Sequence, residues 1–85
     1  MISGRLGELR AVLEARLVGE DAGFRGVATD TRQRPAGRLF VALRGANHDG
    51  HEFVAEAARA GAAGAVVDHE LDVPLPQLVV DDTRT

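Results

Sequence analysis

Residues 39–68 read LFVALRGANHDGHEFVAEAARAGAAGAVVD, and this stretch decides the fold. The run LFVAL at 39–43 is continuously apolar, which is typical of strands covered on both faces. Apolar side chains then recur through 51–60 at helical spacing, and Gly61 is a good helix stop. A second apolar run, AAGAVVD at 62–68, indicates another buried strand. These segments together predict a βαβ unit.

The segment between the first strand and the helix, residues 44–50, has a defined place in such a unit. Two strands joined by a helix are nearly always parallel with a right-handed crossover, so this loop is expected at the C-terminal edge of the sheet. Ligands bind at that edge in open α/β sheets, and the start of the following helix favours anions. The stretch GANHDGH at 45–51 is therefore a candidate loop for a polar or phosphorylated ligand.

Further elements are predicted on both sides of this unit. Leucines at helical spacing indicate an amphipathic helix over 3–17, with Ser3 as its N-cap and Gly19 ending it. A strand is expected at 24–29 and another at 77–82, while DTRT at 82–85 looks like the start of a further helix.

The segment 31–38 contains Pro35 and Gly37 and is expected to be a loop. Because it is too short for a helical crossover, strands 24–29 and 39–43 are expected to be either an antiparallel pair or not direct neighbours. The predicted fold class is α/β, with a small mixed sheet of about four strands, flanking helices and one right-handed βαβ unit.

Composition limits the classes of function. At 85 residues the chain is one small domain, 1–85, able to bury roughly 60 to 65% of its unfolded surface. It has no cysteine, no signal-like start and no apolar run near the ~18 residues of a membrane span, so a soluble cytoplasmic protein is expected. All ten basic residues are arginine, which excludes a P-loop lysine from these residues. A net charge of -3 argues against nucleic acid as the main partner.

Several residues of the loop have a structural interpretation as well as a functional one. Asp49 and Gly50 are strong turn formers, and Asp49 can cap the helix. His48 and His51 lie three positions apart, but only one further histidine exists and no carboxylate pattern completes a metal site. The sequence therefore predicts no metal, and His69 is expected at the surface at the end of a strand.

The stretch TDTR at 29–32 has two interpretations that the sequence leaves open. It can be a simple Asx-type turn, or its side chains can hydrogen-bond to a carbonyl-rich ring or a phosphate. No catalytic constellation accompanies it, because Ser3 is the only serine and cysteine is absent. These residues therefore indicate a binding module rather than a complete catalyst.

TDTR, the run from PAGRLFVAL to GAVVD, and LPQLVVDDT, taken in this order, closely resemble the N-terminal domain of the Mur ligases, which build peptidoglycan precursors. The resemblance covers about residues 24–83. Within that family, DGH at 49–51 resembles the branch that adds D-alanyl-D-alanine. The branch that adds the diamino acid, which usually reads DGR, is the close alternative.

This resemblance implies that the domain holds the uridine diphosphate end of UDP-N-acetylmuramoyl-tripeptide. It implies that the central ATP-binding domain and the C-terminal ligase domain, with ATP and Mg²⁺, belong to a parent enzyme that serves cell-wall biogenesis, cell shape and division. The 85 residues alone are expected to bind substrate and not to catalyse. Neither nucleic acid nor a membrane is an expected partner.

The resemblance also implies roles for particular residues. The expected contacts to the nucleotide are Thr29, Thr31, Arg32, Ala46, Asn47 and His48, and the residues expected to shape the loop are Gly45, Asp49, Gly50 and His51. The chain departs from the family pattern at Thr31, where serine is usual, and at His48, where phenylalanine is frequent. Two alternatives from other classes are a free-standing protein-interaction module and a stand-alone nucleotide-binding domain.

Overall fold

The computed structural model describes residues 3–29, 34, 36–42 and 50–81 of the chain. The elements in chain order are β1 (Ser3–Arg5), α1 (Leu6–Leu13), β2 (Arg16–Val18), β3 (Gly23–Arg25), β4 (Val27–Ala28), β5 (Leu39–Val41), the 3-10 helix η2 (Gly50–Phe53), α2 (Val54–Arg59), β6 (Gly64–Val67) and β7 (Gln77–Val79).

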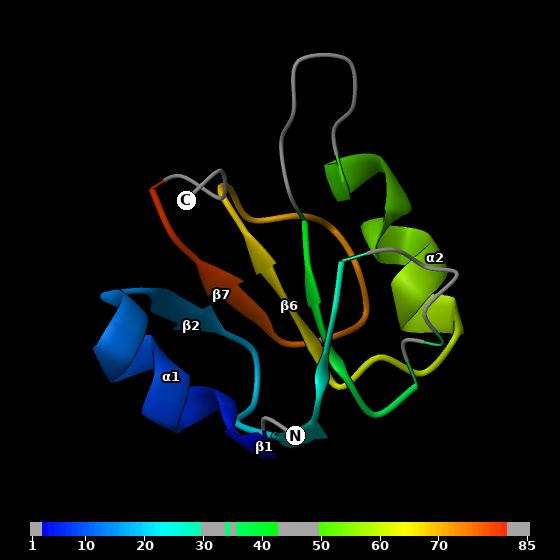
Figure 1. Ribbon diagram of the computed structural model, residues 1–85. Helices are drawn as coiled ribbons and strands as arrows, with labels where there is room; N and C mark the ends of the chain where they lie inside the picture. Colours follow the sequence, from blue (N-terminus) through cyan, green and yellow to red (C-terminus); the bar gives the residue numbers. More distant parts are fainter. Residues whose placement is uncertain (1–2, 30–33, 35, 43–49, 82–85) are drawn as a thin grey trace.

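Five strands form one mixed sheet in the order β2-β7-β6-β5-β4, and β1 and β3 form a separate antiparallel pair (Figure 1). The strands β4, β5, β6 and β7 run parallel to one another, whereas β2 runs antiparallel to β7. The predicted βαβ unit is confirmed as β5, α2 and β6, and the predicted α/β class with a mixed sheet is confirmed with it.

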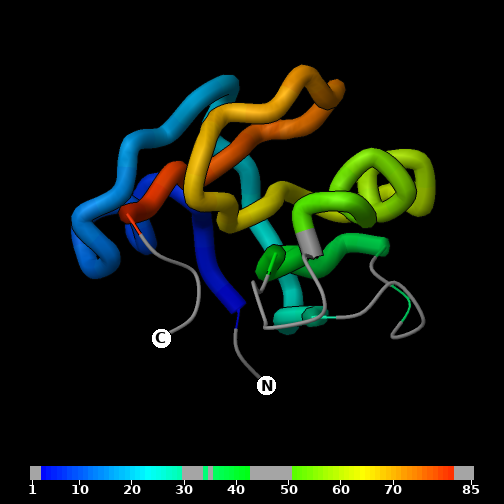
Figure 2. Tube along the Cα trace, turned by 90° about the horizontal axis from the view of Figure 1, so that it is seen from above, coloured from blue at the N-terminus to red at the C-terminus, as the bar shows by residue number. Residues whose placement is uncertain are grey.

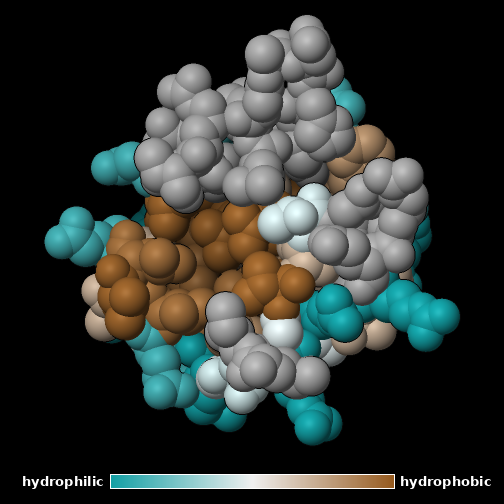
Figure 3. Space-filling model, viewed as in Figure 1, coloured by the Kyte–Doolittle hydropathy of each residue, from teal (hydrophilic) through white to brown (hydrophobic). Residues whose placement is uncertain are grey.

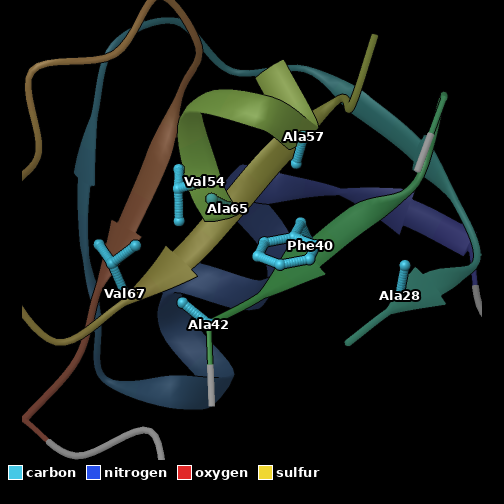
Figure 4. Packing of buried hydrophobic residues seen from close by; sticks show 7 residues of the cluster. All are labelled: Ala28, Phe40, Ala42, Val54, Ala57, Ala65 and Val67. Atoms are coloured by element: carbon cyan, nitrogen blue, oxygen red, sulfur yellow. The ribbon is translucent and has the colours of Figure 1, made fainter. Parts of the chain in front are cut away.

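The sheet has a helix on each face, and its strands alternate side chains between the two (Figures 1 and 2). On the α2 face, seven buried residues form one cluster, in which Phe40 lies among small side chains (Figure 4): Ala28, Phe40, Ala42, Val54, Ala57, Ala65 and Val67. Alternation places the neighbouring residues of the same strands, Leu39 and Val66, on the α1 face. All four residues of β6 are buried, as expected of a strand covered on both sides.

On the α1 face, Leu6 is fully buried against the sheet, together with Phe24 and Leu78. Further along the same helix, Val12 and Leu13 are exposed, and Figure 3 shows apolar surface gathered on this side of the molecule. The first turn of α1 is therefore the part that anchors the helix to the sheet.

The predicted helix over 3–17 is too long at both ends. Residues Ser3–Arg5 pair with β3 instead, so Ser3 is not the N-cap, and Arg16–Val18 pair with β7. The helix begins after Arg5, whose N–H donates to the Glu8 carboxylate at 3.1 Å, and it ends where Glu14 adopts a left-handed conformation with φ of 54°. At both ends of the predicted helix, hydrogen bonds between strands thus replace helical ones. The leucine spacing did not reveal the change, because Leu17 packs against the same apolar cluster as Leu6 although it lies in a strand.

The relation expected between the strands at 24–29 and 39–43 is also wrong. The first segment divides at Gly26, with φ of 87°, into β3 and β4, and β4 lies directly beside β5 and parallel to it. A two-residue strand rises only about 7 Å, and the link from 29 to 38 can span about 33 Å, so no helix is needed to bring the chain back. The shortness of β4 makes this tight parallel connection possible.

The helix predicted over 51–60 is confirmed with changed bounds, since it starts as the 3-10 turn η2 before α2. It ends near Gly61, whose φ of 93° suits glycine. The expected helix start at 82–85 lies outside the described residues. Of the helices that the structure describes, none is long and apolar enough to cross a membrane.

Candidate functional site

The C-terminal ends of the parallel strands meet at one edge of the sheet. Thr29 follows β4, Ala42 follows β5, Asp68 follows β6 and Val80 follows β7. Residues 43–49 connect β5 to η2 and lie outside the described residues. The candidate site is therefore this edge, which is where parallel α/β sheets bind ligands.

The structure describes three of the residues predicted for the site. Thr29 is exposed just beyond β4, Gly50 opens η2, and His51 follows it. The other seven predicted residues lie outside the described residues: Thr31, Arg32, Gly45, Ala46, Asn47, His48 and Asp49. The proposed nucleotide contacts of these seven stay predictions.

His51 connects the start of η2 to the end of β6. Its side chain is only 5% exposed, and its Nε2 accepts a hydrogen bond from the Asp68 N–H at 3.0 Å. Accepting at Nε2 assigns the ring proton to Nδ1 in the neutral imidazole. The same Nε2 lies 3.1 Å from Asp68 Oδ1. His51 thus ties the chain immediately after the predicted ligand loop to the neighbouring strand.

A second histidine completes this group at the surface. His69 Nδ1 lies 2.6 Å from the same Asp68 Oδ1, and its ring stacks on that of His51 with centroids 4.9 Å apart and planes 15° apart. The His69 side chain is 55% exposed, in agreement with its predicted place at a strand end. Sequence reasoning treated the two histidines separately and did not include Asp68. The sequence did contain a signal for this group, because Asp68 ends the buried strand predicted at 62–68 and His69 directly follows it, and the end of that strand is expected beside the 44–50 loop.

A cleft lies elsewhere on the domain and has the wrong charge for a diphosphate. This open cleft of about 780 Å³ is lined by the end of β2 and by residues 70–77, and its lining includes Glu20, Glu70 and Asp72. Beside it the buried Gln77 side chain holds the loop by donating to the Leu71 carbonyl and accepting from the Leu71 N–H, both at 2.7 Å. Both polar atoms of the amide therefore have a partner within the fold. The carboxylates would repel an anion.

The fold defines the general class of this protein as an α/β domain whose parallel strands end at one edge of a mixed sheet. Comparison with known proteins makes the assignment specific. The model of the Mur ligase family, catalytic domain, matches residues 23–82. The chain belongs to the Mur ligase family.

Individual relatives agree with this assignment. The chain is 49% identical to the UDP-N-acetylmuramoyl-tripeptide--D-alanyl-D-alanine ligase of Escherichia coli (strain K12), over 99% of this chain and 19% of that protein. It is 34% identical to the UDP-N-acetylmuramoyl-L-alanyl-D-glutamate--2,6-diaminopimelate ligase of Bacillus licheniformis, over 76% of this chain and 13% of that protein. A crystal structure of MurF from Acinetobacter baumannii superposes with a TM-score of 0.82 at 31% identity, covering 92% of this chain and 18% of that one. The chain thus spans only 13 to 19% of the length of these relatives.

Proposed function

We propose that this chain is the domain that binds the UDP end of UDP-N-acetylmuramoyl-tripeptide in a ligase that adds D-alanyl-D-alanine. The observation that carries the proposal is the 49% identity to such a ligase over nearly the whole chain. The parallel-strand edge supports it, because the loop at 43–49 joins a strand end to a helical turn there.

The parent enzyme would be cytoplasmic and would use ATP with Mg²⁺ through domains other than this one. The terminal carboxylate of the tripeptide would become an acyl phosphate, and the amine of D-alanyl-D-alanine would displace the phosphate to form an amide. This domain would contribute by holding the nucleotide, so that binding energy from a remote group orients the reacting carboxylate. We assign nucleotide contact to Thr29, Thr31 and Arg32 and to residues 46–48.

A ligase that adds the diamino acid is the second candidate, because such enzymes also match this chain. Their matches cover 76% and 71% of the chain, whereas the D-alanyl-D-alanine ligase of Escherichia coli matches over 99%. The difference in coverage favours the D-alanyl-D-alanine branch.

Titration of UDP-N-acetylmuramoyl-tripeptide into the ¹⁵N-labelled chain tests the binding role. We expect amide shifts concentrated at 29–32 and 45–51, and UDP alone should reproduce most of them. The cleft beside Gln77 serves as the internal control. Shifts confined to residues 70–77 would contradict the assigned edge, and no shift at millimolar ligand would contradict the binding role.

The activity of the full-length parent separates the two ligase branches. With UDP-N-acetylmuramoyl-tripeptide and ATP, phosphate release should require D-alanyl-D-alanine. Release that instead requires a diamino acid and the shorter dipeptide substrate would favour the second candidate.

A further inference from the structure

The group formed by His51, Asp68 and His69 brings two imidazoles and one carboxylate together where β6 ends. His51 Nε2 accepts a hydrogen bond from the Asp68 N–H and lies 3.1 Å from Asp68 Oδ1. The same carboxylate oxygen lies 2.6 Å from His69 Nδ1. A metal cation bound by these atoms would replace the hydrogen bond to His51 Nε2 and the proton between Asp68 and His69.

The donor atoms have the chemistry of a transition-metal site. Potential ligand atoms of the two imidazoles and the carboxylate all lie within 4.8 Å of one another. Two ligands of a tetrahedral Zn²⁺ ion lie about 3.4 Å apart, given metal–ligand bonds of about 2.1 Å. The observed 3.1 Å between His51 Nε2 and Asp68 Oδ1 is close to this value.

The third donor is placed so that it can adjust. The 2.6 Å between His69 Nδ1 and Asp68 Oδ1 is too short for two ligands of one ion and corresponds to a hydrogen bond. Because the His69 side chain is 55% exposed, its ring can turn to open this distance, whereas the buried His51 stays fixed. An ion would thus enter from the His69 side, displace the proton between the two groups and take water at its remaining position.

We propose that His51, Asp68 and His69 form a binding site for a borderline transition-metal dication such as Zn²⁺. Two nitrogen donors favour Zn²⁺, Co²⁺ or Ni²⁺ over the hard, oxygen-seeking Mg²⁺. The site joins the start of η2 to the end of β6, so the ion would link these two elements.

Calorimetric titration of ZnCl₂ into chelator-treated chain without a purification tag tests the proposal. We expect one Zn²⁺ per chain and no comparable binding of Mg²⁺. His69→Ala should weaken Zn²⁺ binding at least about tenfold, the loss that even a change next to a ligand brings. Repeating the titration in buffers with different ionisation heats should show release of a proton.

Asp72→Asn is the matched control, because it removes an exposed carboxylate outside the group and should leave Zn²⁺ affinity unchanged. His51→Gln and Asp68→Asn should also weaken binding, and circular dichroism would show that each variant is folded. Because His69 is exposed, its variant keeps the test decisive even where a His51 variant does not fold.

A spectroscopic measurement identifies the ligands directly. Zn²⁺ should shift the ring signals of His51 and His69 together in ¹⁵N-histidine spectra, and it should raise the melting temperature of the wild type but not of His69→Ala. Absence of Zn²⁺ binding, an unchanged affinity in His69→Ala, or shifts of His48 alone would each overturn the proposal.

Discussion

At the scale of single residues, Asp21 organises the start of α1 from outside the helix. Its Oδ1 accepts the Gly7 N–H at 2.8 Å, and its Oδ2 accepts from Arg5 Nε at 3.2 Å. The Gly7 hydrogen bond is the main reason that the pKa of Asp21 lies below its ordinary value of 3.8, and Arg5 adds to the effect. Helix N–H groups lack partners in the first turn, so a carboxylate there stabilises the helix.

We therefore expect Asp21→Asn to lower stability at neutral pH but not in strong acid. The folded pKa is depressed, so the stabilisation is present above the unfolded value of 3.8 and is lost as pH falls through the lower folded pKa. Thermal unfolding followed by circular dichroism from pH 7 to about pH 2 checks this, and the difference in melting temperature should vanish at the acid end. Asp72→Asn removes the same charge from an exposed loop and serves as the control. A difference that persists in acid would contradict the electrostatic explanation.

At the scale of elements, β6 can lie close to α1 only because residue 64 has no side chain. A Cβ at Gly64 would be 2.9 Å from Leu6 Cδ1 and 3.2 Å from the Pro76 carbonyl oxygen. Leu6 is fully buried and has little room to move. Gly64 is thus needed for packing. Gly37 is needed for a different reason, its backbone φ of 73°. A Cβ there would have room, because no atom of the described residues other than its chain neighbours lies within 4 Å of that position.

Gly64→Ala should lower the free energy of unfolding by about 1 to 3 kcal/mol, as overpacked core positions do. The smaller Leu6→Val should relieve part of the clash, so the double variant should lose less stability than the sum of the two. Gly37→Ala should lower the free energy of unfolding by about 1 to 2 kcal/mol, because alanine disfavours the left-handed backbone there. Its effect should add to that of Leu6→Val. Urea unfolding measures all five variants. Simple additivity of Gly64→Ala with Leu6→Val would show that the Leu6 contact is not the cause.

At the scale of the whole molecule, two apolar clusters lie on opposite faces of one sheet and share its strands. Phe40 is at the centre of the α2 cluster, and Leu6 is at the centre of contact between α1 and the sheet. Because β5, β6 and β7 contribute to both clusters, neither face can lose its packing without disturbing the other.

We expect Phe40→Ala to lower the free energy of unfolding by about 3 to 5 kcal/mol and Leu6→Ala to lower it by about 2 to 5 kcal/mol. Each variant should still unfold in a single transition of the entire domain. The chain has no tryptophan or tyrosine, so circular dichroism at several wavelengths is the appropriate measurement. Val12→Ala is the control, since Val12 is 77% exposed and its loss should change stability by less than about 0.5 kcal/mol. Separate transitions for α1 and the sheet would contradict a shared core.

The amino-acid sequence by itself determined the βαβ unit and the family, and it predicts a ligand site at the C-terminal edge of the sheet. Continuous apolar runs, helical spacing and Gly61 are local signals, and several short motifs in one order carry the family resemblance without any contact being known. The roles predicted for Thr31, Arg32 and residues 45–49 stay predictions. The His51 connection was anticipated only as loop architecture, because its partner Asp68 is 17 positions away in sequence.

The tertiary structure alone decided how the strands pair. Leu17 has helical spacing but pairs with β7 in a strand, and β4 lies parallel to β5 through a link too short for a helix. It also decided that His51, Asp68 and His69 meet. The physical reason is common to all three: hydrogen bonds between strands and contacts between side chains join residues distant in sequence, and local propensity contains no information about such partners.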